Sequence, residues 1–182
     1  MNFIASSGQL RASFLRWSLF AVPAVMLLGF LGGQFGSPQS LWFLNLEKPG
    51  FYPPGSVFGI VWTVLYVMIG LAVALVASAW GARGRAIALI AFIIHFALNV
   101  SWHGVFFAGE NISAGLILLL AIDATLLIVI ALFWRVRRSA GLLLLPYLAW
   151  VLFATFLNYE IMQLNPDGGI YVPPSETQRI EI

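Results

Sequence analysis

The sequence contains no cysteine and very little charge. Only 9% of its 182 residues are Asp, Glu, Lys or Arg, whereas about a quarter are charged in an ordinary soluble domain. The lack of cysteine excludes disulfides, thiolate metal sites and cysteine nucleophiles. The lack of charge excludes an ordinary water-facing surface. Because 61% of the residues are apolar, lipid is the simplest solvent for this chain.

Long uncharged runs divide the sequence. Residues 17–46, 49–82, 86–109 and 139–159 contain no charged side chain, and Asp123 alone interrupts the run between Glu110 and Arg135. A spanning helix needs about 20 mostly apolar residues, and backbone groups in hydrocarbon must be satisfied internally. The runs lack the strict alternation of a β-barrel. We therefore predict an all-α integral membrane protein, a bundle of five transmembrane helices over residues 17–35, 58–80, 86–107, 113–134 and 141–162.

The chain is predicted to form one domain, the transmembrane bundle over residues 17–165. A cytoplasmic extension over residues 1–16 precedes it, and a flexible tail over residues 166–182 follows it. The first apolar run follows two arginines, as a signal peptide would. It is longer than a typical signal core of about 7–15 residues, and no clear cleavage site follows it. We interpret this run as a retained helix.

Positive charge is distributed unevenly over the two ends of the predicted bundle. Five crossings place the termini on opposite sides, and Lys48 and Arg179 are the basic residues on the C-terminal side. Positively charged loops stay on the cytoplasmic side. We therefore predict a cytoplasmic N-terminus in a bacterial-type inner membrane. The basic residues on the N-terminal side are Arg11, Arg16, Arg83, Arg85, Arg135, Arg137 and Arg138.

The connection between the first two predicted helices, residues 36–57, is too long for a hairpin. It is rich in proline and aromatic residues, and proline rules out a regular helix through its second half. Long loops of this kind are usually lids, binding loops or linkers. Its aromatic residues fit either an interfacial belt or a lid over a binding site, and the sequence leaves both interpretations open.

Polar and aromatic residues recur at helical spacing inside the predicted spans. At about 1.5 Å per residue, most of them lie in the half of the membrane beneath the long loop. This convergence predicts a small-molecule pocket with apolar walls and a few polar groups. Taken singly, such residues also serve as belt tryptophans or as interhelical hydrogen-bonding groups. The stripes comprise Trp62 and Tyr66; His95, Asn99 and Trp102; and Tyr147, Trp150, Ala154 and Asn158.

Asp123 and His95 lie at similar depth, which suggests a buried pair, because a carboxylate in the membrane needs a partner. Alternatively, Asp123 is protonated or is satisfied by backbone. His95 and His103 are about 80° apart around their helix and do not form one chelating face, so we predict no metal site. Small residues such as Gly29 and Gly70 permit close helix contacts, either within one chain or between chains.

Three stretches carry motifs that together resemble a known family. The first is Leu46-Glu47-Lys48-Pro49 with Pro53-Pro54, Phe58, Trp62-Thr63 and Tyr66; the second is Leu98-Asn99 with Trp102 and Phe106-Phe107; the third is Pro146-Tyr147-Leu148-Ala149-Trp150 with Phe153-Ala154 and Leu157-Asn158. These motifs are similar to those of the TspO/translocator protein family, which includes the bacterial tryptophan-rich sensory proteins and the mitochondrial peripheral benzodiazepine receptor. The resemblance covers roughly residues 20–165.

The resemblance implies a five-helix bundle whose pocket binds porphyrins such as protoporphyrin IX or haem, with cholesterol as a further ligand of some members. Tyr66, Asn99, Trp102, Trp150 and Ala154 match the family's pocket positions. With the remaining aromatic and amide candidates, the predicted ligand-binding set is Trp42, Phe51, Trp62, Tyr66, Asn99, Trp102, Tyr147, Trp150, Ala154 and Asn158.

One departure bears on chemistry. Many bacterial members of the family carry tandem tryptophans after the Lys-Pro, where this sequence has Gly50 and Phe51. A loop tryptophan implicated in porphyrin photochemistry is therefore absent. The sequence also supplies no hydrolytic triad, metal cluster or nucleotide loop. We accordingly name no catalytic residue and favour a binding protein over an enzyme.

The function predicted from the sequence is that of a membrane tetrapyrrole-binding protein with a sensory, regulatory or transport role. The alternatives are a photochemical porphyrin-degrading enzyme, or a transporter or binder of another hydrophobic ligand such as a sterol or lipid. No cofactor is expected to be required. The expected partners are a porphyrin or haem, the lipid bilayer and a second copy of the chain in a homodimer, with no nucleic acid.

Overall fold

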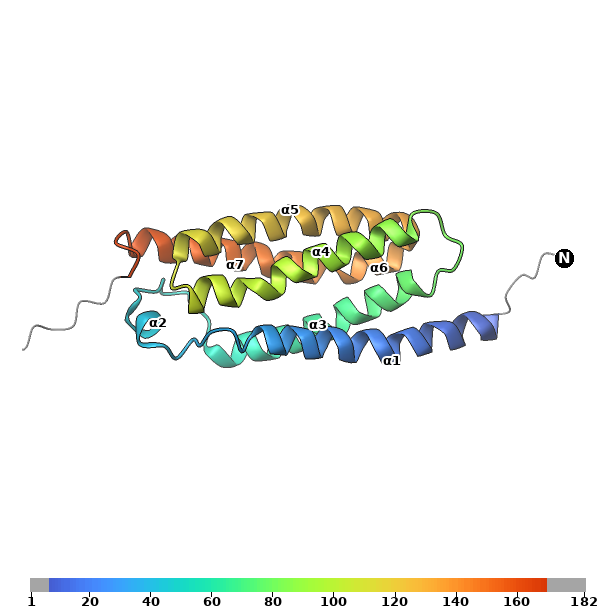
Figure 1. The fold of residues 1–182 in the computed structure, drawn as a ribbon, viewed down its shortest axis with the longest axis horizontal. Coiled ribbons are helices and arrows are strands. Elements are labelled where there is room, and N and C mark those ends of the chain that lie inside the picture. The colour runs from blue at the N-terminus through green and yellow to red at the C-terminus, as the bar shows by residue number, and fades with distance from the viewer. Residues whose placement is uncertain (1–6, 170–182) are drawn as a thin grey trace, which may run out of the picture.

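The computed structural model describes residues 7–169, and most of these are helical (Figure 1). Five helical segments are long and apolar enough to cross a membrane, as predicted. In chain order the elements are α1 (Ser7–Gly32), α2 (Leu41–Asn45), α3 (Gly55–Ala77), α4 (Arg85–His103), the π-helical segment η1 (Gly104–Ala108), α5 (Ile112–Val136), α6 (Arg138–Leu143) and α7 (Leu145–Leu164).

The helices form an elongated bundle in which α1 packs along α3, and α5 contacts α4, α6 and α7. In Figure 1, α1 and α3 run along one side of the bundle and α4, α5 and α7 along the other. The first and last described residues lie at opposite ends, as five crossings require. The short helix α2 lies at the end where α7 finishes, and this end carries the candidate site.

Large apolar side chains cover the outside of the bundle. Leu19, Ile93 and Ile117 are 78%, 65% and 69% exposed, respectively. Such side chains would be unfavourable in water, but they suit contact with lipid tails. The outer surface therefore agrees with the prediction of a membrane bundle.

Small residues allow α1 and α3 to approach closely. A Cβ atom added at Gly70 would lie 2.6 Å from the Cα atom of Val22 on α1, and one added at Gly29 would overlap the ring of Tyr66 on α3. These glycines therefore serve contacts within one chain. A homodimer would have to use another surface.

Most helix ends lie within about three residues of the expected bounds, and two differences are larger. Helix α1 begins at Ser7, ten residues before the expected start of the first helix, so residues 7–16 are helical. The fifth span is divided at Leu144 into α6 and α7. Pro146 explains this break, because proline has no N–H and its ring clashes with the carbonyl four residues earlier. Residues 1–6 and 170–182, which include most of the predicted tail, lie outside the described part of the chain.

Candidate ligand-binding cavity

The long connection between α1 and α3 folds over the bundle as a lid, which we define as residues 36–54. Ser40 caps helix α2 by accepting a hydrogen bond from the Phe43 N–H at 3.2 Å. This places Trp42 and Phe43 on the buried side of α2, where each is only 5% exposed. They pack with Phe106 and with apolar residues of α5 and α7. Of the two interpretations of this segment, the structure supports the lid.

Asn165, just after α7, fastens the lid to the bundle. The Glu47 N–H donates to its side-chain oxygen, and its side-chain amide donates to the Glu47 carbonyl, both at 2.9 Å. The Trp42 indole N–H also donates to the Gly168 carbonyl at 3.2 Å. Because these bonds join segments far apart in the sequence, they hold the lid in its closed position. We call the Asn165–Glu47 pair the latch.

Lys48 stabilises the lid from within. Its ammonium group donates to the carbonyls of Phe43 at 2.6 Å and Leu46 at 3.0 Å, and it lies 4.5 Å from the centre of the Phe43 ring. Burial lowers the pKa of Lys48. The charge that the sequence places near the site is therefore engaged with the lid's own backbone.

Replacing Asn165 with alanine is expected to loosen the lid. The change removes both latch bonds and leaves a backbone N–H and a carbonyl of Glu47 without these partners. Hydrogen–deuterium exchange of the full chain should then quicken across residues 41–48 by about fivefold or more, because each net hydrogen bond contributes about 1 kcal/mol.

Asn45→Ala provides the matched control. The Asn45 side chain is exposed and bonds only within α2, to the Leu41 carbonyl at 2.7 Å. Unchanged exchange in Asn165→Ala, or equal acceleration in the two variants, would contradict the assignment of the latch.

Beneath the lid lies a cavity of about 280 Å³. Its walls come from the lid and from every spanning helix after α1, so the cavity exists only in the folded bundle. Most of its lining is aromatic or aliphatic. The lining residues are Gly33, Pro38, Phe43, Tyr52, Gly55, Phe58, Trp62, Asn99, Trp102, His103, Phe106, Phe107, Leu119, Ile122, Trp150, Val151, Ala154, Leu157, Asn158 and Ile161.

Six of the ten residues predicted to bind ligand line this cavity. The structure thus brings together residues of α3, α4 and α7 that the helical spacing placed on inward faces. A spacing of three and four residues identifies one face of a helix, and the inward faces of neighbouring helices meet in the bundle. The six residues are Trp62, Asn99, Trp102, Trp150, Ala154 and Asn158.

Two buried polar atoms of lining residues have no partner among the described residues, the indole N–H of Trp150 and the side-chain oxygen of Asn158. In contrast, the Trp102 indole N–H donates to the Gly115 carbonyl at 3.1 Å, and the Asn158 amide donates to the Ile112 carbonyl at 3.0 Å. Buried polar groups are normally paired. The Trp150 indole N–H is therefore a buried donor without a protein partner, on a residue that lines the cavity.

The other four predicted residues lie outside the lining. Tyr66 and Tyr147 are behind Trp62, with their ring centres 5.2 and 6.0 Å from its own. Trp42 is buried within the lid against Phe106. Phe51 lies away from the cavity, stacked on the half-exposed ring of Phe156 at 5.6 Å.

Sequence reasoning missed several lining residues. Phe58 and Phe106 could have been found by spacing, because they lie four residues from Trp62 and Trp102, respectively, and share their faces. Phe43 and Tyr52 could not, since their inward direction depends on helix α2 and on the path of the lid. In the π-helical segment η1, the Gly109 N–H bonds to the carbonyl five residues earlier, that of Gly104, at 2.8 Å. This wider turn changes the directions of the side chains that follow from those expected of an α-helix. Such segments often occur at functional sites.

The suggested pair between Asp123 and His95 is wrong. The two ring nitrogens of His95 contact the hydroxyls of Thr125 at 2.9 Å and Tyr147 at 3.0 Å. Asp123 instead accepts a hydrogen bond from Thr155 on α7 at 2.7 Å. Two residues apart on α5, Asp123 and Thr125 point in directions about 200° apart, so only Thr125 faces α4. The described residues contain no group of His, Asp and Glu that could hold a metal ion.

Comparison with known proteins agrees with this architecture. The model of the TspO/MBR family matches residues 21–164. The tryptophan-rich protein TspO of Chlorobaculum tepidum is 37% identical over 143 residues, covering 78% of this chain and 90% of that protein. The tryptophan-rich sensory protein of Cereibacter sphaeroides is 36% identical over 124 residues, covering 68% and 77%.

A more distant relative is the human translocator protein, which is 32% identical over 149 residues and is matched over 79% of this chain and 88% of its own length. The family match covers all five spanning segments at least in part. This chain, an integral membrane protein with five spanning helices, therefore belongs to the TspO/MBR family.

Proposed function

We propose that the cavity beneath the lid binds a tetrapyrrole such as protoporphyrin IX or haem, and that binding serves a sensory, regulatory or transport role. The observation that carries this proposal is the unpaired indole N–H of Trp150 beside a cavity lined by aromatic rings and aliphatic side chains. The names of the relatives, a sensory protein and a translocator protein, support a role of this kind. We further propose that the end of the bundle opposite the lid faces the cytoplasm.

The lining suits a large flat ligand with a polar edge. Rings of Trp62, Trp102 and Trp150 offer faces or edges on which a macrocycle can stack. The Trp150 N–H can donate to a carboxylate. The Tyr52 phenol, whose pKa burial raises above its ordinary value, is a further protonated donor at neutral pH. The cavity thus combines apolar walls with a few hydrogen-bond donors, as small-molecule sites do.

The size of the cavity implies movement. At about 280 Å³, it is near the lower limit of about 300 Å³ for pockets that hold drug-sized ligands. A tetrapyrrole is at least that large. The lid must therefore shift to admit it, and the latch is the contact that such a shift would break.

Trp150→Phe tests the proposal, because phenylalanine keeps an aromatic ring and removes the N–H donor. Titration of the purified protein with protoporphyrin IX, followed by porphyrin absorbance in the dark, should show saturable binding. The variant should bind about threefold to tenfold more weakly, as expected for the loss of one hydrogen bond.

Trp134→Phe is the control, because Trp134 lies at the far end of α5 and does not line the cavity. Absence of saturable binding to the unmodified protein, or equal affinity in all three proteins, would refute the assignment. Repeating the titration under illumination tests the enzyme alternative, since consumption of porphyrin in the light alone would favour it.

A further inference from the structure

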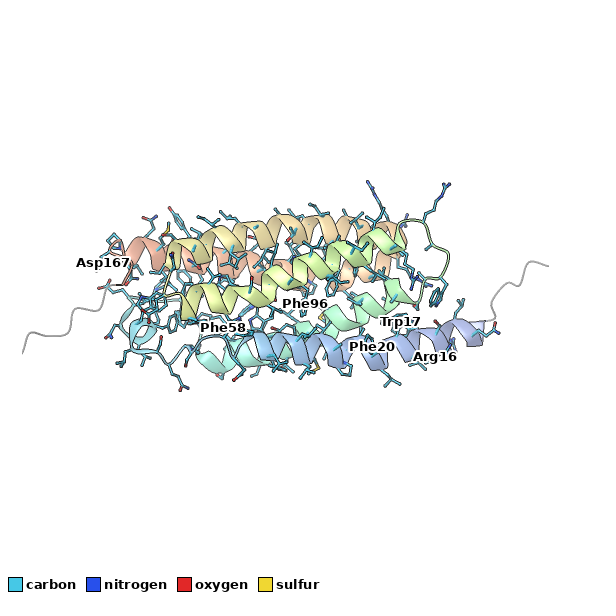
Figure 2. The ribbon with its side chains drawn as sticks, viewed as in Figure 1. Arg16, Trp17, Phe20, Phe58, Phe96 and Asp167 are labelled. Atoms are coloured by element: carbon cyan, nitrogen blue, oxygen red, sulfur yellow. The ribbon has the colours of Figure 1, made fainter. Side chains whose placement is uncertain are left out.

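A second hollow lies at the opposite end of the bundle, between α1 and the turn after α3. It is an open hollow of about 360 Å³, lined by Ser13, Arg16, Trp17, Phe20 and Trp80. Figure 2 shows the labelled residues Arg16, Trp17 and Phe20 on one stretch of α1, far from Phe58 and Asp167 at the lid end. We call this hollow the α1 groove. It shares no lining residue with the cavity beneath the lid.

The α1 groove changes from polar to apolar along the helix. Its four residues on α1 follow i, i+3, i+4 and i+7 spacing and so form one face. Arg16 is the last charged residue before the uncharged run, and Phe20 lies four residues, about 6 Å, farther into the membrane. The groove thus has a cation at its outer end and a ring at its inner end, which matches the headgroup and acyl chain of a phospholipid.

Aromatic contacts hold the far wall of the α1 groove in place. The ring centres of Trp17 and Trp80 are 6.5 Å apart, which joins α1 to the turn after α3. The Arg85 guanidinium lies 4.2 Å from the Trp80 ring, and its Nε donates to the Ala77 carbonyl at 2.9 Å. Trp80 is nevertheless 69% exposed. Its indole is therefore positioned by neighbours and still open to a ligand.

The charge at this end of the bundle has one sign. Arg16 and Arg83 are exposed, and no ion pair between an arginine and a carboxylate occurs within residues 7–169. Four acidic residues of that range lie in or beside the lid end: Glu47 in the lid, Glu110 between η1 and α5, Glu160 near the end of α7, and Asp167 after α7. The fifth, Asp123, is buried on α5. Among residues 7–169, no acidic side chain at this end competes for the arginines. An anionic ligand is therefore favoured over a neutral or zwitterionic one.

We propose that the α1 groove binds one anionic phospholipid, whose phosphate contacts Arg16 and whose acyl chain lies along Phe20, Trp17 and Trp80. The site recognises the phosphate and the acyl chain of the same lipid molecule. An interfacial belt alone would hold the helix ends without choosing among headgroups. Selectivity for headgroup charge, dependent on Arg16, is therefore the property that distinguishes this site.

Native mass spectrometry of the full chain in detergent tests the site directly. Titration with phosphatidylglycerol should show one lipid bound about fivefold or more tightly than phosphatidylcholine of the same acyl chains, because one arginine near the headgroup contributes about that factor. Arg16→Gln should abolish this preference. Trp80→Ala should weaken both lipids, because it removes the apolar wall.

Arg137→Gln is the matched control, because Arg137 is an exposed arginine at the same end that does not line the α1 groove. Arg16→Lys should retain a preference for phosphatidylglycerol. Equal binding of the two lipids would overturn the proposal, as would equal losses in Arg16→Gln and Arg137→Gln, which would indicate diffuse surface charge. Displacement of the lipid by inorganic phosphate alone would also overturn it, since the groove would then be a free-phosphate site.

Discussion

Replacing Gly70 with alanine is expected to destabilise the bundle by about 1–3 kcal/mol, the usual range for overpacking a well-packed interior. The new methyl group would lie 2.6 Å from the Val22 Cα atom and 3.0 Å from the Val22 nitrogen. These are backbone atoms of α1, so no side-chain rotation can relieve the overlap. The two helices must separate, which loosens contacts along their whole interface. Unfolding of the purified protein by heat or by denaturing detergent measures the loss.

Gly59→Ala in the same helix is the control, because a methyl group there meets no atom within 4 Å. Alanine also favours helix over glycine, so this variant should be at least as stable as the unmodified protein. Gly70→Leu should be less stable than Gly70→Ala. Equal stability of the two alanine variants would show that α1 and α3 are not held as closely as the structure places them.

The spanning helices and the inward stripes could be predicted from the sequence because both depend on local patterns. A membrane span requires a long apolar run, and a stripe requires only the 3.6-residue period. This explains why Asn99, Trp102, Trp150 and Asn158 were placed on inward faces and then found together. The close fit of Gly70 against Val22 belongs to the same class, since small residues at helical spacing suggested it.

Other features depend on how helices rotate and how loops fold, and the sequence alone does not determine these. Similar depth in the membrane suggests that His95 and Asp123 are neighbours. The orientation of α5 about its own axis instead brings Thr125 to His95 and Asp123 to Thr155. Composition showed that the lid is aromatic, but not which rings face inward. Phe43 does so because of helix α2, whereas Phe51 stacks on the outside of the bundle.

Which aromatic rings could take part in chemistry also depends on how the lid folds. The sequence has Phe51 where many bacterial members of the family are expected to carry a tryptophan, and this is one of the reasons to favour binding over catalysis. In the structure, Phe51 does not line the cavity, while the tryptophans that do are Trp62, Trp102 and Trp150. The question of photochemistry therefore concerns these three rings, and the illuminated titration addresses them.

Phe106→Ala is expected to have the largest effect at the lid end, about 3–5 kcal/mol of lost stability, as for other buried phenylalanines. Phe106 is only 2% exposed and stacks on Trp102 with ring centres 4.7 Å apart. It also contacts Trp42 and Phe43 of the lid, at 5.5 and 6.1 Å. Its removal therefore opens a void between the lid and the bundle, and it takes away part of the cavity wall.

Two measurements separate these consequences, unfolding in the absence of ligand and protoporphyrin IX affinity at a temperature where the variant is folded. The free energy of unfolding and the porphyrin affinity should both fall in Phe106→Ala. Phe106→Leu should recover most of the stability, because leucine restores most of the lost side-chain volume. Phe156→Ala is the control, since that ring is 50% exposed and pairs with Phe51 outside the cavity. If Phe106→Ala lost no more stability than Phe156→Ala, the lid would not be seated on Phe106. If it lost stability but kept full porphyrin affinity, the ligand would bind elsewhere than beneath the lid.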